Sequence, residues 1–257
     1  MRGVGPVGAV AVLSFWASLR GLRALALAAF AVVPTLIVLA LVGARASTSQ
    51  IGDAAQGLFL ELTIPIVSIV IVLLLSVGQF RTEIDDDTLG YLTSRSIPRE
   101  GIVLGKYLGS TGAALVFLVP AALLPIAVAL AAGAPSLPDG ALGAIVAITV
   151  LAAVAYGALF LLLGLVTSWA LLLGLLLGFL WEELLVNLPG SFPRLTVIFY
   201  LRSLASDLVG SGPLSGYTIA LPTADAVLAP IAAAVVFVVA GMATIRVVEL
   251  APERSSA

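Results

Sequence analysis

Long apolar runs follow one another along almost the whole chain, and short polar stretches separate them. A helix that spans a bilayer needs ~20 consecutive, mostly apolar residues. Several runs reach this length, and none alternates polar with apolar residues as a membrane strand does. The runs are Leu22–Val42, Leu60–Phe80, Ile102–Ala132, Ala141–Thr167, Trp169–Leu188 and Ala224–Val248. The pattern predicts an all-α integral membrane protein with six transmembrane helices in a single transmembrane domain, residues 1–257.

Composition agrees with this class and excludes much chemistry. The chain is 61% hydrophobic and 10% charged, whereas soluble domains carry about 25% charged residues. It contains no Cys and no His, so disulfides, thiolate chemistry and imidazole metal sites are excluded. We expect no catalytic residue, no metal site and no nucleic-acid partner.

The residues before the first apolar run predict a short helix of their own. Residues 7–20 include Phe15 and Trp16 and end in basic residues, at Arg20 and then Arg23. This composition is typical of a helix that lies in the membrane interface. The alternative is that these residues extend the first span.

The basic residues predict the orientation, because cytoplasmic loops of membrane proteins are enriched in Lys and Arg. With both termini in the cytoplasm, three basic residues lie outside: Arg45, Arg194 and Arg202. Nine lie inside: Arg2, Arg20, Arg23, Arg81, Arg95, Arg99, Lys106, Arg246 and Arg254. We therefore expect a multi-pass protein of the cell membrane with cytoplasmic termini.

One polar segment, residues 81–100, carries eight charged residues between the second and third apolar runs. Asp87 or Thr88 can cap a short helix there, because their side-chain oxygens accept hydrogen bonds from free backbone N–H groups. Leu89 and Leu92 would then share one side of that helix. The segment predicts a cytoplasmic helix through which a soluble partner moves the two adjoining spans. An ordinary solvated loop is the alternative.

This segment resembles the first cytoplasmic loop of permease subunits of type-2 ABC transporters, an exporter-type family with six spans. Two positions depart from the family pattern, Asp87 in place of Gly and Ser96 in place of Pro, although Pro98 follows two residues later. Phe179–Leu204 is also similar to some members. The matching residues, in order, are Glu83, Thr88, Leu89, Leu92, Ser94, Arg95, Arg99, Ile102, Gly105 and Lys106.

The resemblance implies that two permeases pair and that each docks a cytoplasmic ABC ATPase through this coupling helix. ATP and magnesium would bind to the ATPase, since the only lysine, Lys106, is not part of a phosphate-binding G-x-x-x-x-G-K-[ST] loop. The residues expected to couple to the ATPase are Glu83, Asp87, Thr88, Leu89, Leu92, Ser94 and Arg95.

Glycines four residues apart in the fifth run are candidates for close helix packing. Gly174 and Gly178 would let a second backbone approach, because lipid supplies no hydrophobic drive between helices. We interpret this pair as part of a homodimer seam, with helix packing inside one chain as the alternative.

Two acidic residues, Glu182 and Glu183, follow the apolar residues of the fifth run. Carboxylates inside a membrane are costly and usually face a cavity or a partner. They would line the translocation path or the outer gate, or pair with Arg194 or Arg202. Alternatively, the span ends early and both lie among the lipid headgroups.

Residues 189–222 form the longest external segment. Leu195–Leu204 is apolar enough to dip back into the membrane, and the resemblance implies re-entrant helices here that close the outer gate. A surface loop is the alternative.

The sequence thus predicts the permease subunit of an ATP-driven exporter, which pairs as a dimer in membrane lipid. The alternatives are a secondary transporter or channel that acts without an ATPase, and a membrane scaffold. The transported compound is not indicated by the sequence.

Overall fold

The computed structural model describes residues 5–85, 98–188, 191–209 and 221–248. Every regular element among these residues is a helix, and none of them lies in a strand. The predicted all-α class is therefore confirmed. The α-helices are α1 (Pro6–Ser18), α2 (Gly21–Gly43), α3 (Thr48–Leu58), α4 (Ile69–Asp85), α6 (Arg99–Ala131), α7 (Ala141–Val166), α8 (Ala170–Leu175), α9 (Glu182–Val186), α10 (Val197–Val209) and α11 (Thr223–Val248). Two π-helical segments, η1 (Phe59–Ser68) and η2 (Leu176–Trp181), and one 3-10 helix, η3 (Phe192–Leu195), complete the series.

In the described part of the chain, 5 helices are long and apolar enough to cross a membrane. This is the architecture of a multi-pass membrane protein, as the apolar runs predict. The second span is longer than predicted, because α3, η1 and α4 join into one helix of 34 residues. The predicted fifth span is instead divided among α8, η2 and α9. The spanning helices are Gly21–Gly43, Thr48–Arg81, Arg99–Ala131, Ala141–Val166 and Thr223–Arg246.

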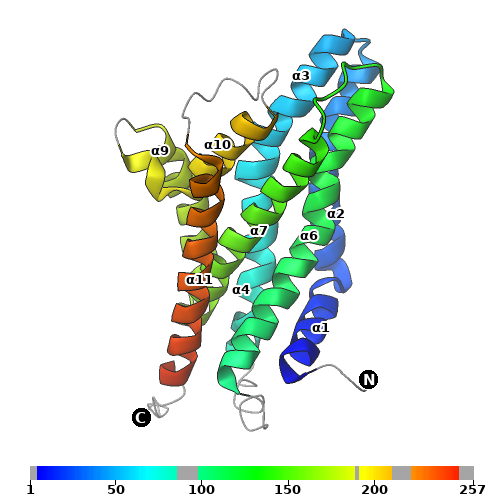
Figure 1. Ribbon diagram of the computed structural model, residues 1–257. Helices are drawn as coiled ribbons and strands as arrows, with labels where there is room; N and C mark the ends of the chain where they lie inside the picture. The colour runs from blue at the N-terminus through cyan, green and yellow to red at the C-terminus, as the bar shows by residue number, and fades with distance from the viewer. Residues whose placement is uncertain (1–4, 86–97, 189–190, 210–220, 249–257) are drawn as a thin grey trace.

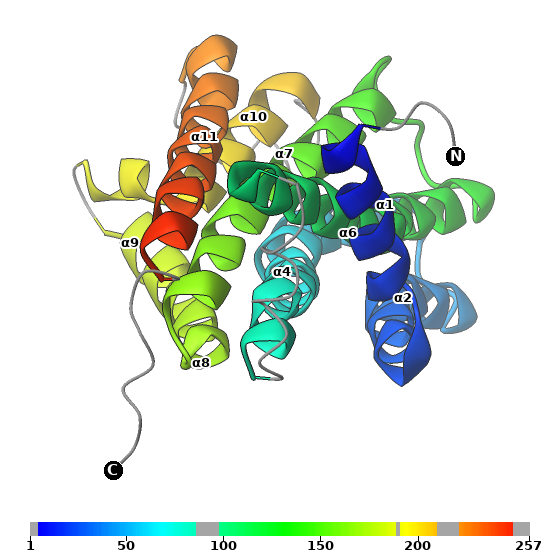
Figure 2. The same cartoon turned by 90° about the horizontal axis from the view of Figure 1, so that it is seen from below.

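The helices form a bundle around α7, which contacts α4, α6, α10 and α11 (Figure 1). Tyr156 and Phe160 of α7 are among the largest fully buried side chains. Seen along the bundle, α2 and α8 lie on either side of α4 (Figure 2). The centre of the bundle is therefore α7 with its neighbours, and α2 and α8 flank it on one face.

The bundle has two distinct ends, which we call the lower end and the upper end as they lie in Figure 1. At the lower end α1 begins and α11 ends, close to the end of α4 and the start of α6. At the upper end lie α3, α9 and α10 (Figure 1). The run α8–η2–α9 leads from the lower end of α7 back to the upper end. The start of α1, the end of α4, the start of α6 and the end of α11 are thus on the same side.

The N-terminal helix α1 is separate from α2 and packs against α6. The break lies before Gly21, whose φ of +82° falls in the left-handed region that glycine tolerates. The contact with α6 is close: a Cβ atom on Gly105 would lie 2.7 Å from Cβ of Val10 and 2.9 Å from the carbonyl oxygen of Val7. Residues 6–18 therefore form a helix of their own and do not extend the first span. Gly105 of α6 allows the close approach of α1.

Replacing Gly105 with alanine should destabilise the bundle, because the new methyl group overlaps the backbone of α1. Overpacking of this kind costs about 1–3 kcal/mol, which would lower the thermal unfolding midpoint of the purified protein in detergent. Gly57→Ala is the matched control, since a Cβ atom there meets nothing within 4 Å and alanine favours a helix. Equal midpoints for the two variants would contradict the close α1–α6 contact.

Candidate functional site

Two π-helical segments meet near the upper end of the bundle. η1 interrupts the second span and η2 lies between α8 and α9, and the two segments contact each other. π-helical segments are rare and occur frequently at functional sites. Each carries or adjoins an acid: Glu61 lies in η1, and Glu182 directly follows η2. This junction is the place where ionisable side chains gather in the membrane-spanning part of the fold.

Glu182 is buried and caps the N-terminus of α10. It accepts hydrogen bonds from the backbone N–H of Val197 (3.1 Å) and of Ile198 (2.9 Å). The first N–H groups of a helix lack partners within the helix, and the helix dipole favours an anion beside them. Thr196 Oγ1 accepts a further hydrogen bond from the N–H of Phe199 (3.4 Å). Glu182 therefore fixes where α10 begins relative to α9.

Arg202 joins the same region to the second span. Its Nη2 atom lies 3.4 Å from Oε2 of Glu61 and 3.6 Å from Oε1 of Glu183. The Arg202 side chain is 8% exposed, whereas those of Glu61 and Glu183 are 58% and 43% exposed. Arg202 reaches this position because Leu201 and Leu204, on the same helix, are buried in the core. One buried guanidinium group thus holds two half-exposed carboxylates.

Tyr156 approaches the same cluster from α7. It is fully buried, and its ring stacks on Phe160 with centroids 5.9 Å apart. Its hydroxyl adjoins the carboxylate of Glu182, and the charged groups of Arg202 and Glu183 are also within electrostatic range. We call these residues the ion cluster: Glu61, Tyr156, Glu182, Glu183 and Arg202.

Sequence reasoning identified part of the ion cluster. The acids after the fifth run, Glu182 and Glu183, were candidates, and the structure places them with Arg202, whereas Arg194 lies exposed outside the cluster. Glu61 and Tyr156 were missed. Glu61 could have been found as a lone carboxylate inside an apolar run, which is a recognised sign of a functional position.

The predicted coupling residues lie largely outside the described part of the chain. Residue 83 belongs to the last turn of α4, whose side chains there are not described. The rest of that group falls in residues 86–97, outside the described residues: Asp87, Thr88, Leu89, Leu92, Ser94 and Arg95. Their role stays a prediction.

The glycine pair of the fifth run faces α4 of the same chain. A Cβ atom on Gly174 would overlap Leu73, and one on Gly178 would overlap Ile69. This placement favours the alternative that the pair serves helix packing within one chain. Participation in a seam between two copies stays a prediction.

A polar contact at the lower end joins the helices on either side of the predicted coupling segment. Lys106 of α6 is buried, donates a hydrogen bond to the backbone carbonyl of Gln79 in α4, and lies 4.5 Å from the ring centroid of Phe80. The side chain of Gln79 donates in turn to Ser18 Oγ of α1 (2.8 Å). These two hydrogen bonds connect α1, α4 and α6 next to the predicted coupling segment.

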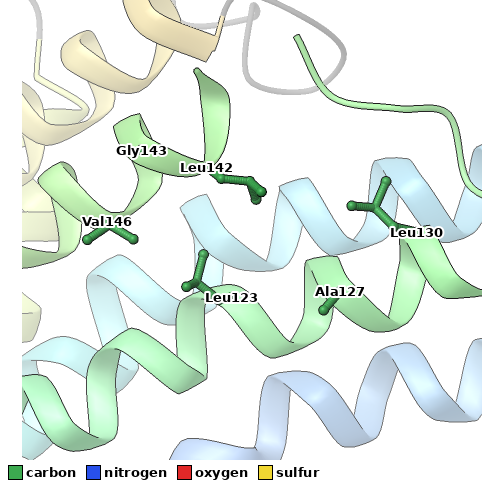
Figure 3. Close-up of a pocket in the computed structure, with 6 residues that line it drawn as sticks. All are labelled: Leu123, Ala127, Leu130, Leu142, Gly143 and Val146. Atoms are coloured by element: carbon green, nitrogen blue, oxygen red, sulfur yellow. The ribbon is translucent and has the colours of Figure 1, made fainter. Parts of the chain in front are cut away.

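A groove between α6 and α7 has a different character. Its volume is about 490 Å³, and Figure 3 shows six residues from the two helices around it: Leu123, Ala127, Leu130, Leu142, Gly143 and Val146. Ligand sites normally combine an apolar lining with a few polar groups that orient the ligand. These six side chains offer no polar group, so the groove fits a lipid chain better than a polar ligand.

No group of three or more His, Cys, Asp or Glu side chains in the described part of the chain is arranged to hold a metal ion. The comparison with models of known protein families and with curated proteins finds no match. The structure defines a helical fold of the multi-pass membrane type, with an ion cluster around the buried Arg202 at its upper end.

Replacing Arg202 with methionine should destabilise the protein, because Glu61 and Glu183 then lose their shared cation. Removing one partner of a hydrogen-bonded charged group lowers the free energy of unfolding by about 1.5–3 kcal/mol. The decrease should be near the lower value, because Glu61 and Glu183 are half exposed and water can replace part of the lost contact. Thermal unfolding in detergent measures it. Arg194→Met, at an exposed position, should leave the midpoint nearly unchanged. Similar midpoints for both variants would show that Arg202 does not hold the upper end together.

Proposed function

We propose that the chain is the membrane-spanning permease subunit of an ATP-driven ABC transporter, most consistent with an exporter. The observation that carries the proposal is the polar segment 81–100 between two spans, with its ordered match to the coupling loop of type-2 permeases. The arrangement of α4 and α6 supports it, because both helices bring the ends of this segment to the same end of the bundle.

The proposed coupling segment docks a separate cytoplasmic ATPase. Leu89 and Leu92 would provide the buried contact, and Arg95 with the neighbouring acids would fix the register. Movement of the docked ATPase would displace α4 and α6 directly, because these helices adjoin the two ends of the segment. The hydrogen bond between Lys106 and the backbone of Gln79 joins these two helices close to the segment, which supports their movement as one unit.

We propose six spans, with the run α8–η2–α9 as the fifth, and both termini in the cytoplasm. The distribution of basic residues supports this orientation, nine inside against three outside. The lower end of the bundle is then cytoplasmic, α1 lies in or near the inner interface, and the ion cluster lies toward the outside of the cell membrane. The helices η3 and α10 take the place of the re-entrant helices that the resemblance implies.

Two copies of the chain would form the complete pathway, embedded in membrane lipid. The chain itself is not proposed to be an enzyme: ATP and magnesium would bind to the ATPase, because this sequence lacks a phosphate-binding loop. In this arrangement the ion cluster belongs to the outer gate, where Glu182 and Glu183 set the position of α10 against the second span.

A secondary transporter or channel is the second candidate. The ion cluster favours it, because ionisable groups beside interrupted membrane helices are typical of transporters that act alone. The two candidates differ in whether the chain requires an ATPase.

The coupling proposal predicts that Leu92→Asp and Arg95→Glu each weaken docking of the ATPase. The first change puts a charge into the buried contact and the second reverses the charge that sets the register, so each should weaken binding at least tenfold, since a lost hot-spot contact costs about 2 kcal/mol. Affinity purification of the tagged chain, co-expressed with the ATPase encoded nearest to it, measures the bound fraction.

Arg45→Glu is the matched charge reversal for this experiment. Arg45 is exposed in the connection between α2 and α3, away from the proposed docking segment. It should retain the ATPase fully. Full retention by Leu92→Asp and Arg95→Glu as well would contradict the assignment of the coupling segment.

A further inference from the structure

We propose that the junction of α1 and α2 binds an anionic phospholipid of the leaflet at the lower end, with the lipid phosphate held by Arg20 and Arg23. The apolar side chains beside these arginines would contact the acyl chains. Such a lipid site is independent of the proposed transport function and does not require an ATPase. In the proposed orientation the lipid belongs to the inner leaflet.

Arg23 extends from the first turn of α2 onto the backbone of α4. A Cβ atom on Gly78 would lie 2.7 Å from Nη1 of Arg23 and 3.0 Å from Nη2, so the guanidinium group lies directly over this glycine. Gly78 is three residues before Arg81, where the second spanning helix ends. Long basic side chains near the end of a membrane helix direct their charged groups toward the interface. Arg23 is therefore held where a lipid head group meets the lower end of the second span.

Arg20 is the second cation of the site. It directly precedes α2, at the bend where α1 ends and α2 begins, and it is exposed, as Arg23 is. The two arginines lie three positions apart, on either side of Gly21. A guanidinium group presents its donors in a planar fork that matches the oxygens of a phosphate. Two such groups at one bend therefore suit a phosphate better than any cationic or neutral head group.

The N-terminal part of the chain is basic throughout. The first 52 residues contain four arginines and neither Asp nor Glu. Among the described side chains, none forms an ion pair with Arg20 or Arg23. Basic residues beside a membrane surface attract anionic lipids. The charge of this part of the surface is thus complementary to an anionic head group.

The helices beside the arginines expose apolar side chains that suit acyl chains. Leu13 and Trp16 share one face of α1, and Leu22 and Leu25 share one face of α2, because residues three apart are neighbours on a helix. All four residues are more than half exposed. Tryptophan is typical of the membrane interface. Phosphate-binding groups next to an exposed apolar surface favour a phospholipid over a soluble anion.

Quenching of tryptophan fluorescence by brominated lipids tests the site, because Trp16 lies one helical turn before Arg20. The full chain contains three tryptophans, and Trp169→Phe with Trp181→Phe leaves Trp16 as the reporter. The protein is reconstituted in phosphatidylcholine vesicles that contain brominated phosphatidylglycerol or the same fraction of brominated phosphatidylcholine. We expect Trp16 to prefer the anionic lipid by about 5- to 25-fold, since each arginine near the surface contributes about fivefold, and the preference should fall at high salt. Equal quenching by the two lipids would overturn the proposal.

Trp169 is the matched reporter away from the arginines. It precedes α8 at the same end of the bundle, and α8 and α2 lie on either side of α4 (Figure 2). Trp16→Phe with Trp181→Phe leaves Trp169 as the reporter, which should be quenched equally by the two lipids. An equal preference for the anionic lipid at Trp169 would show a general attraction to the protein and would overturn a site at Arg20 and Arg23.

Variants of the two arginines test the position. Arg20→Gln and Arg23→Gln should each lower the preference at Trp16 about fivefold, and the double variant should remove it. Arg20→Lys combined with Arg23→Lys keeps both charges and should retain most of the preference. Arg45→Gln, in the connection between α2 and α3, should have no effect. Thermal unfolding confirms that each variant is folded, and an unchanged preference in the folded double Gln variant would overturn the site.

Inorganic phosphate distinguishes a lipid from a free anion. Added to the vesicles, with chloride at the same ionic strength as the control, it should leave the quenching of Trp16 unchanged. Displacement of the brominated phosphatidylglycerol would show that the site takes a soluble anion and would overturn the lipid assignment. No ATPase is present in these experiments. Their failure therefore leaves the permease proposal intact, and failure to find an ATPase leaves the lipid site intact.

Discussion

Inside a bilayer an ionisable group is costly unless it pairs with another group of the protein or faces water, and this constraint organises both ends of the bundle. At the upper end, Arg202 reaches carboxylates on two other elements, and Glu182 supplies the acceptors that the first N–H groups of α10 need. At the lower end, the buried Lys106 finds a backbone carbonyl and the face of Phe80. Each contact crosses from one helix to another, so it fixes neighbouring segments relative to each other as well as satisfying a charge.

Between the two ends, the helices are held together by close van der Waals packing, because lipid provides no hydrophobic driving force for helix association. Glycines supply that approach where backbones or large side chains meet them: Gly105 receives α1, and Gly174 and Gly178 receive Leu73 and Ile69 of α4. The π-helical segments adjoin these contacts: Gly178 lies in η2, Ile69 directly follows η1, and the acids Glu61 and Glu182 lie in or next to the same segments. The glycine contact of Gly178 is thus continuous with the part of the bundle that carries the ion cluster.

The apolar runs were enough to predict the helical class and the position of the long spanning helices, because in a membrane length and hydropathy nearly decide whether a segment spans. They did not predict that Thr48–Leu58 would extend the second span, because its polar residues resemble a loop; the spacing of Ser47 and Gln50, which form a capping box, was the signal in the sequence that could have shown it. The carboxylates of the fifth run stood out by their chemistry. Glu61 and Tyr156 did not, because their role depends on distant residues that the fold brings together, Arg202 being 141 positions from Glu61.

The central claim is that the lower end of this bundle, with the polar segment between α4 and α6, is the site where an ATPase drives the membrane helices. Its most direct test is the mass of the complex formed when the chain is co-expressed with the ATPase encoded nearest to it and extracted in mild detergent. The account predicts a particle with two copies of each chain and ATP hydrolysis that vanadate inhibits. A chain that purifies alone, with no ATPase bound, would contradict the account and favour a transporter that acts by itself.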